Sequence, residues 1–229
     1  MMPMVMAMIS LIGLGVDVCF IKSEYAGEMK KATLLKGIAS FFFVLLGVIC
    51  YVDHPTNVGI LIVIGLVLGM LGDIFLNMRN LYEGAKSNRI FAVGILAFLA
   101  GHFLYIAFLL GEAESRLYIT LLLTLVLSVM AIPPLMKKIT APSKGLKIFG
   151  YVYLIIVIAM FSSSVNLVCS KGLSNLSLVF LLGAFLFVVS DFIMIYYSFG
   201  RKIKPLRAIN LLAYYVGQLL IAGCIQLVG

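Results

Sequence analysis

Two aspartates, Asp73 and Asp191, stand inside long apolar stretches of the 229-residue sequence. If these stretches cross a bilayer, a charge near the middle costs at least about 2.5–3.5 kcal/mol, so such residues are functional candidates. A carboxyl group in these surroundings can donate and accept protons, and we expect a functional role for both aspartates. The structural alternative is that each one pairs with a buried lysine or caps a broken helix.

Other polar residues recur at helical spacing within the same kind of stretch. His102 and Tyr105 are three residues apart, and Tyr214 and Gln218 are four apart, so each pair shares a helical face. We expect a functional role for His102, and for Tyr214 and Gln218 function and packing are equally open. The alternative is hydrogen bonding that only fixes the packing of helices.

Further polar residues lie nearer the ends of the apolar stretches. Asn77 lies one turn beyond the first aspartate and is placed to orient its carboxyl group. Asp17 is expected either in an interfacial ion pair or in the site. Lys36 is expected to extend to the membrane interface, with substrate anchoring as the second interpretation. The serines at 162–164, with Asn166, predict hydrogen bonds between helices.

Eight long apolar stretches must position these residues. The sequence is 63% hydrophobic and 11% charged, whereas soluble domains are nearer 45–50% and about 25%, which excludes an ordinary soluble enzyme. A membrane-spanning helix needs about 20 apolar residues, and helices satisfy their own backbone groups in lipid. We therefore predict an all-α, multi-pass integral membrane protein with one domain over residues 1–229. Its eight transmembrane helices are predicted at 4–21, 32–52, 58–78, 90–110, 117–135, 148–168, 178–199 and 206–228.

The basic residues predict how the chain is oriented. Of the 17 lysines and arginines, only Arg116 and Lys171 fall in the loops that follow the even-numbered stretches. The positive-inside rule then predicts that the basic loops are cytoplasmic and that both termini lie outside. Because the basic residues lie between apolar segments, the net charge of +8 does not indicate a nucleic-acid partner; the expected partner is the lipid bilayer.

Common catalytic and metal-binding motifs do not occur in the sequence. The two histidines are far apart and the four cysteines have no CxxC spacing, so neither a metal site nor a disulfide framework is predicted. Neither a GxSxG elbow nor a Walker loop is present, which gives no support to a serine hydrolase or an ATP-driven pump.

A short internal pattern relates the two halves of the sequence, 1–115 and 116–229. LGDIF at 71–75 corresponds to VSDFI at 189–193, and Gly-His at 101–102 corresponds to Gly-Gln at 217–218. Because each half has four predicted helices, the repeat would be parallel. Both aspartates would then lie at comparable depth, and we expect them to face one cavity that opens toward the cytoplasm.

Four polar motifs lie in order along the chain. They are GMLGDIFLNM at 69–78, FAVGILAFLAGHFLY at 91–105, GAFLFVVSD at 183–191 and YYVGQ at 214–218. Together they resemble the third, fourth, seventh and eighth spans of the YhhN family of membrane lysoplasmalogenases. The resemblance covers most of the chain and implies the same eight-span layout. The second span departs from the family pattern, since Lys-Lys-Ala at 30–32 stands where Lys-Pro is expected.

The resemblance implies hydrolysis of the vinyl-ether bond of a lysoplasmalogen to a fatty aldehyde and glycerophosphocholine or glycerophosphoethanolamine. This reaction needs a general acid, an anion beside the developing oxocarbenium ion, and a group that activates water. The implied catalytic residues are Asp73, Asp191 and His102, with the aspartates as an acid–base pair. The implied substrate contacts are Tyr105, Tyr214, Gln218, Asn77, Lys36 and Asp17. Neither a metal nor an organic cofactor is expected.

Other functions fit the same residues. A proton-coupled transporter of a small solute or lipid would use the same intramembrane aspartates. A membrane scaffold would use the polar residues only to hold helices together. We expect a multi-pass protein of a bacterial cytoplasmic membrane, and the sequence predicts no oligomeric state.

Overall fold

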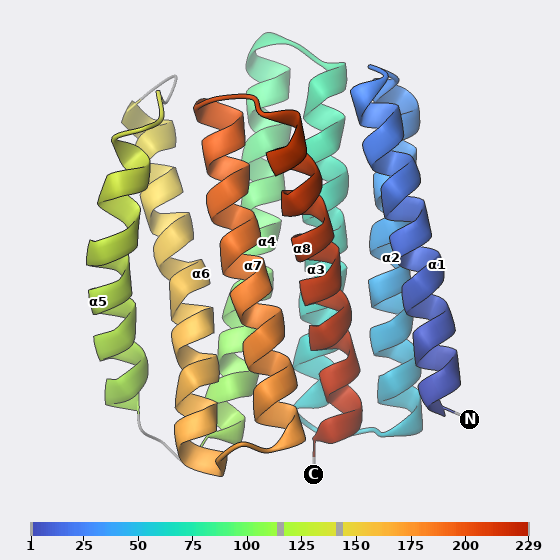
Figure 1. Ribbon diagram of the computed structural model, residues 1–229, viewed down its shortest axis with the longest axis vertical. Helices are drawn as coiled ribbons and strands as arrows, with labels where there is room; N and C mark the ends of the chain where they lie inside the picture. Colours follow the sequence, from blue (N-terminus) through green and yellow to red (C-terminus); the bar gives the residue numbers. More distant parts are fainter. Residues whose placement is uncertain (1, 114–116, 141–143, 229) are drawn as a thin grey trace. The chain divides into compact units, whose positions relative to one another are not determined.

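The computed structural model describes residues 2–113, 117–140 and 144–228 of the chain. Within them every regular element is a helix, and eight helices are long and apolar enough to cross a membrane (Figure 1). They are α1 (Met2–Tyr25), α2 (Met29–Asp53), α3 (Gly59–Met78), α4 (Gly84–Glu112), α5 (Leu117–Met136), α6 (Lys144–Lys171), α7 (Asn175–Phe199) and α8 (Lys204–Gly223). Two short 3-10 helices follow α3 and α8: η1 (Arg79–Leu81) and η2 (Cys224–Leu227). The predicted all-α, eight-span architecture is confirmed.

Most helices run past the apolar stretches from which they were predicted. The fourth helix begins at Gly84 rather than at residue 90, and the sixth begins at Lys144 rather than at 148. Apolar counting stops at the first charged residues, whereas backbone hydrogen bonds continue through them. Arg116, which the charge pattern places in an outer loop, lies outside the described residues.

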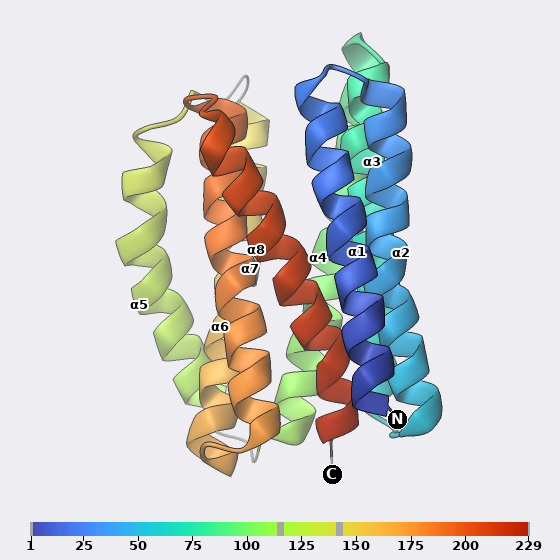
Figure 2. The same cartoon turned by 45° about the vertical axis from the view of Figure 1, so that its right-hand side comes forward.

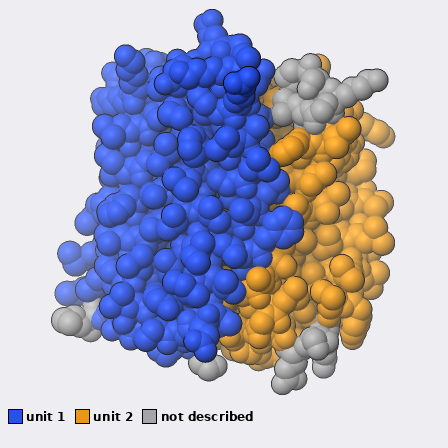
Figure 3. All heavy atoms as spheres, turned by 180° about the vertical axis from the view of Figure 1, so that it is seen from behind, with its two compact units in different colours: residues 1–105, 218–229 blue, residues 106–217 orange. Residues whose placement is uncertain are grey.

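The chain forms two compact units, coloured separately in Figure 3. Unit 1 comprises residues 1–105 and 218–229, and unit 2 comprises residues 106–217. The boundaries fall inside α4 and α8, so each of these helices contributes to both units.

In unit 1, α2 packs on both α1 and α3, and the three helices lie together in Figure 1 and in Figure 2. Small residues then bring α3 close to α4. A Cβ added at Gly65 would lie 2.4 Å from the Tyr105 ring, and one at Gly72 would lie 2.5 Å from the Phe98 ring. One at Gly101 would lie 3.0 Å from the Gly65 carbonyl oxygen. Close backbone approach through small residues is the usual way in which membrane helices associate.

The start of α1 and the C-terminal end of α8 lie at the same end of unit 1 (Figure 1). A Cβ at Gly223 would lie 3.3 Å from Met6 Cε, which places the end of α8 beside the start of α1. Gln226 Nε2 donates to the Cys50 carbonyl oxygen at 2.9 Å. These contacts hold η2 against the end of α2.

In unit 2, α6 packs between α5 and α7. The segment of α8 in this unit approaches α7 closely, since a Cβ at Gly217 would lie 2.9 Å from the Gly183 carbonyl oxygen. The α7 helix begins after Ser174, whose hydroxyl accepts a hydrogen bond from the Ser177 backbone N–H at 3.2 Å. This N-cap satisfies one of the backbone donors that the first turn leaves without a partner.

Candidate functional site

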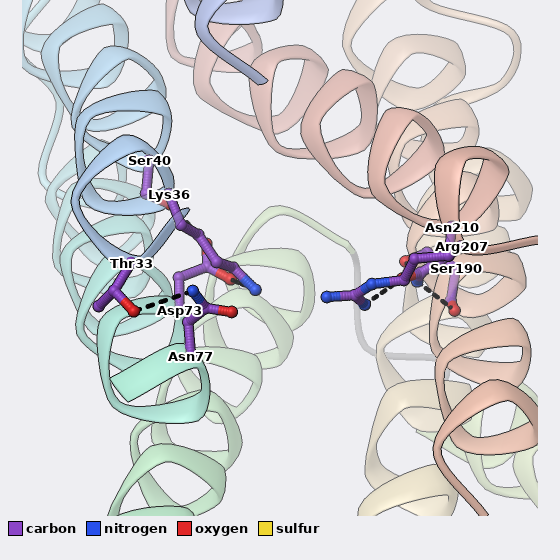
Figure 4. Close-up of polar contacts among 8 residues, drawn as sticks. All are labelled: Thr33, Lys36, Ser40, Asp73, Asn77, Ser190, Arg207 and Asn210. Carbon is purple, nitrogen blue, oxygen red and sulfur yellow. Dashed lines mark hydrogen bonds and ion pairs between the residues drawn. The ribbon is translucent and has the colours of Figure 1, made fainter. Parts of the chain in front are cut away.

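Asp73 forms a buried ion pair with Lys36 in unit 1 (Figure 4). The aspartate is 2% exposed on α3, and Lys36 Nζ of α2 lies 3.1 Å from its Oδ1. Ser40, one turn further along α2, donates its hydroxyl to Asp73 Oδ2 at 2.6 Å. Because α2 packs directly on α3, one face of α2 supplies a donor to each carboxylate oxygen.

This ion pair corrects the expectation for Lys36. Its side chain does not extend to the interface, because the residue is only 7% exposed. Its ammonium group also lies 5.6 Å from the centre of the Phe20 ring of α1, within the range of a cation–π contact. A buried ammonium needs a compensating charge, and Asp73 supplies it. The lysine partner considered as the structural alternative for Asp73 is therefore present.

Asp17 of α1 and Asn77 of α3 are two further predicted site residues in unit 1. Asp17 is fully buried, one turn before Phe20, so it belongs to the interior of unit 1. Asn77 Nδ2 donates to Thr33 Oγ1 at 3.1 Å (Figure 4). Asn77 therefore contacts α2 through Thr33, three residues before Lys36, and its predicted role in orienting the Asp73 carboxyl stays a prediction.

His102, Tyr105 and Gln218 form a second polar group in unit 1. The rings of His102 and Tyr105 meet edge to face with centroids 6.3 Å apart, so the two residues share a helical face as predicted. Tyr105 donates its hydroxyl to Gln218 Oε1 at 3.0 Å. His102 Nδ1 lies 2.7 Å from the Phe98 carbonyl oxygen. Because a carbonyl only accepts, Nδ1 carries the proton and Nε2 is the basic nitrogen of the neutral ring.

The packing of α3 on α4 sets the level of this group relative to Asp73. Gly101, next to His102, packs on Gly65, and Gly65 precedes Asp73 by eight residues, about 12 Å of helix. Helical side chains tilt toward the N-terminus of their own helix. Because α3 and α4 are antiparallel, this tilt moves the carboxyl of Asp73 toward the level of His102, and the imidazole of His102 toward the level of Asp73, along the helix axes.

Asp191 has a different donor in unit 2. It is 4% exposed on α7, and Tyr153 of α6 donates its hydroxyl to Oδ2 at 2.8 Å. Tyr153 was missed in the sequence because a tyrosine within an apolar stretch gives no signal by itself. Tyr214, a predicted substrate contact, is buried against Phe187, with ring centroids 5.2 Å apart.

Next to Asp191, a chain of polar contacts ends in a guanidinium group (Figure 4). Asn210 of α8 donates from Nδ2 to both the carbonyl oxygen and the hydroxyl of Ser190, each at 2.7 Å. Arg207, one turn earlier on α8, donates to Asn210 Oδ1 at 2.9 Å. In the sequence Arg207 was only one of several loop charges, and Asn210 was not singled out.

The two units place their aspartates in corresponding local surroundings. Gly65 and Gly183 each precede the aspartate by eight residues. In each unit a glycine of the following helix, Gly101 or Gly217, packs on the carbonyl oxygen of that residue. In each unit the preceding helix supplies the donor to the carboxyl, a lysine in one case and a tyrosine in the other. These correspondences support the repeat, which stays a prediction.

The polar run on α6 behaves differently from the expectation. Ser163 and Ser164 donate to carbonyl oxygens of their own helix, at Ala159 and Phe161. Ser162 Oγ and both side-chain polar atoms of Asn166 are buried without a hydrogen-bond partner among the described residues. The predicted bonds between helices are therefore wrong there, because serine hydroxyls reach the backbone one turn back in the same helix.

The described residues contain no cluster of three or more histidine, cysteine, aspartate or glutamate side chains that would hold a metal ion. The sequence profile of the YhhN family matches residues 31–225, most of the chain, and the chain therefore belongs to the YhhN family. No curated protein and no solved structure matches it. The fold and the family together establish a membrane protein of a family that includes lysoplasmalogenases.

Proposed function

We propose that this YhhN-family membrane protein hydrolyses the vinyl-ether bond of a lysoplasmalogen, giving a fatty aldehyde and a glycerophosphocholine or glycerophosphoethanolamine. Family membership supplies the reaction class. The observation that carries the proposal is that each unit holds a buried aspartate, Asp73 or Asp191, that interacts with a donor side chain of the preceding helix. Burying such groups is costly, so two of them at corresponding backbone positions favour a function beyond packing.

The proposed reaction proceeds through protonation of carbon. A carboxylic acid transfers its proton to the β-carbon of the vinyl ether, which leaves an oxocarbenium ion at the α-carbon. Water adds to that carbon and loses a proton to a base, giving a hemiacetal. The hemiacetal then collapses to the aldehyde while the glycerol oxygen leaves as a hydroxyl. A carboxylate near the cation lowers the barrier because negative charge is already in place.

The donors assign different roles to the two carboxyl groups. Asp73 is in an ion pair and also accepts from Ser40, an arrangement suited to a carboxylate that holds its charge. Asp191 accepts from a neutral phenol, an arrangement that also suits a protonated carboxyl. We therefore assign proton donation to Asp191, and stabilisation of the cation to Asp73. Such a pair of carboxyls in unlike surroundings is a general way to obtain an acid and a base at one pH.

His102 is proposed as the base for water. Its Nδ1 is committed to the Phe98 carbonyl, so Nε2 of the neutral ring is the nitrogen that accepts a proton. Because the side chains of His102 and Asp73 tilt toward each other along the axes of α3 and α4, the reacting carbon is proposed to lie between the heights of these two residues. Tyr105 and Gln218, which are bonded to each other beside His102, then contact the substrate on the same side.

The test is release of aldehyde by protein purified in detergent. A hydrolase cleaves an alkenyl lysophospholipid without a membrane, whereas a transporter that uses the same aspartates needs two compartments. Acyl and saturated alkyl lysolipids serve as substrate controls. General acid–base groups contribute about 10²–10⁴ in rate, so we expect Asp73→Asn and Asp191→Asn each to lose at least about 100-fold.

The matched control is Asp53→Asn, because Asp53 is an exposed aspartate at the end of α2. We expect it to retain wild-type hydrolysis. A normally folded Asp73→Asn or Asp191→Asn variant with full activity would overturn the mechanism. Vesicle uptake without any aldehyde release would favour the transporter.

A further inference from the structure

Arg207 is connected through Asn210 to Ser190, the residue that precedes the buried carboxyl of unit 2. It is half-buried in the first turns of α8, and its NH1 donates to Asn210 Oδ1 at 2.9 Å. Asn210 is 3% exposed and is itself fixed by two 2.7 Å hydrogen bonds to Ser190. A buried amide thus connects the guanidinium to the residue that precedes Asp191, and this connection fixes the direction of the arginine side chain.

The guanidinium of Arg207 also makes a cation–π contact with an aromatic ring. Its guanidinium carbon is 5.7 Å from the centre of the Tyr197 ring of α7. An arginine held by an amide on one edge and a ring on one face loses little further freedom when it binds a ligand. Guanidinium presents a planar fork of donors that matches the oxygens of a phosphate.

We propose that Arg207 binds the phosphate of the lysophospholipid substrate; this inference rests on the proposed function and names the recognition element of the same site. The spacing along α8 agrees with such a ligand. Arg207 precedes Asn210 by three residues, about 4.5 Å of helix, and Asn210 lies at the level of Ser190. Asp191 lies one residue, about 1.5 Å, beyond Ser190 toward the basic end of α7, so the backbone of Arg207 is about 3 Å of helix nearer that end than Asp191. A separation of a few ångströms is of the order that the three-carbon glycerol skeleton of a lysolipid sets between its ether oxygen and its phosphate.

Unit 1 supplies a matched arginine for comparison. Arg79 of η1 lies 4.2 Å from the centre of the Phe91 ring, a closer cation–π contact than that of Arg207. It is half-buried like Arg207 and also lies at the basic end of its unit. It stands outside the proposed binding machinery, so Arg79→Gln is the control for a general loss of positive charge.

The experiment measures binding by calorimetry to the full chain in detergent. The probe is a saturated 1-alkyl lysophosphocholine, which has no vinyl-ether bond to cleave, and the reference ligand is the 1-alkylglycerol without phosphate. Loss of a hydrogen-bonded charged partner costs about 1.5–3 kcal/mol, so we expect Arg207→Gln to weaken lysophosphocholine binding about 10- to 100-fold. Binding of the alkylglycerol should not change, and Arg79→Gln should bind both ligands as wild type.

A second variant and a second ligand complete the binding experiment. Arg207→Lys keeps the charge but not the fork, so we expect an intermediate loss; this variant decides the matter if Arg207→Gln does not fold. Inorganic phosphate tests whether a free anion is the ligand instead. The proposal is overturned if the variants bind lysophosphocholine as tightly as wild type, or if inorganic phosphate binds more tightly than the lipid in an Arg207-dependent way.

The binding assay and the hydrolysis assay test the phosphate site and the proposed reaction independently of each other. If the wild-type protein cleaves no vinyl ether but binds lysophosphocholine through Arg207, the proposed reaction is wrong and the phosphate site stands. If vinyl ethers are cleaved and Arg207→Gln leaves both binding and KM unchanged, the reaction stands and the phosphate site is wrong.

Discussion

The ion pair between Lys36 and Asp73 allows a direct separation of structural from catalytic importance. At 3.1 Å and an effective dielectric constant of about 20, the Coulomb attraction is about 5 kcal/mol, which desolvation of both groups largely offsets. Removing one partner leaves a buried charge without compensation, and such changes cost about 3–5 kcal/mol. We therefore expect Lys36→Met to lower the free energy of unfolding by about that amount, a shift of at least 100-fold in the folding equilibrium.

The double variant Lys36→Met/Asp73→Asn removes both charges together. Replacing a whole buried pair by neutral groups is often nearly neutral, so we expect the double variant to recover at least about 2 kcal/mol relative to Lys36→Met. The measurement is reversible unfolding in mixed micelles for the wild type, both single variants and the double variant. A Lys36→Met protein as stable as wild type would refute the burial argument.

The hydrolysis assay on the same four proteins decides the role of Asp73. If its carboxylate stabilises the oxocarbenium ion, the double variant folds but does not release aldehyde. If Asp73 serves only to compensate Lys36, the double variant recovers activity together with stability. That second outcome would show that Asp73 has no part in the mechanism and that the ion pair with Lys36 contributes only to stability.

Two further predictions concern single contacts. Tyr153→Phe deletes the 2.8 Å hydrogen bond to Asp191, worth about 0.5–1.5 kcal/mol, so kcat should fall about two- to tenfold with KM unchanged; an unchanged kcat would exclude Tyr153 as a positioning residue. Gly65→Ala places a methyl group 2.4 Å from the rigid Tyr105 ring and should cost about 1–3 kcal/mol in thermal unfolding. The control Gly15→Ala, with nothing within 4 Å of the new atom, should unfold like wild type, and equal stability of the two variants would contradict the packing of α3 on α4.

The eight helices were predictable because a bilayer sets their length and their composition independently of how they pack. The same reasoning identified Asp73 and Asp191, since a carboxyl in an apolar stretch stands out at any register. It did not identify Tyr153 or Asn210, whose roles depend on the rotation of α6 against α7 and of α8 against α7. The rotation of a helix about its own axis is determined by packing. Because the surfaces of these helices are almost uniformly apolar, their sequences do not predict which face points toward a neighbouring helix.

Lys36 shows why local rules also gave a wrong answer. A lysine near the end of a membrane helix normally extends to the interface, and only the facing carboxylate on α3 makes burial the better state. The serines of α6 show the opposite case, in which a short side chain finds a partner in its own helix and contributes nothing between helices. In both cases a local partner competes with a partner on a neighbouring helix, and the sequence alone does not show which of the two is energetically favoured.

The difference between the two aspartates is more informative than their similarity. Each follows a glycine by eight residues and each lies beside a helix whose glycine packs on that carbonyl, so the backbones around them correspond. The donors do not, because unit 1 uses an ammonium group and unit 2 uses a phenol. A repeat kept only for packing would need no such difference, and a symmetric pair of carboxylates would be poor at supplying both an acid and an anion. A protein that uses both carboxyls in catalysis should therefore lose activity when the ammonium donor of one unit and the phenol donor of the other are exchanged. A protein that uses the aspartates only for packing should be least affected by this exchange.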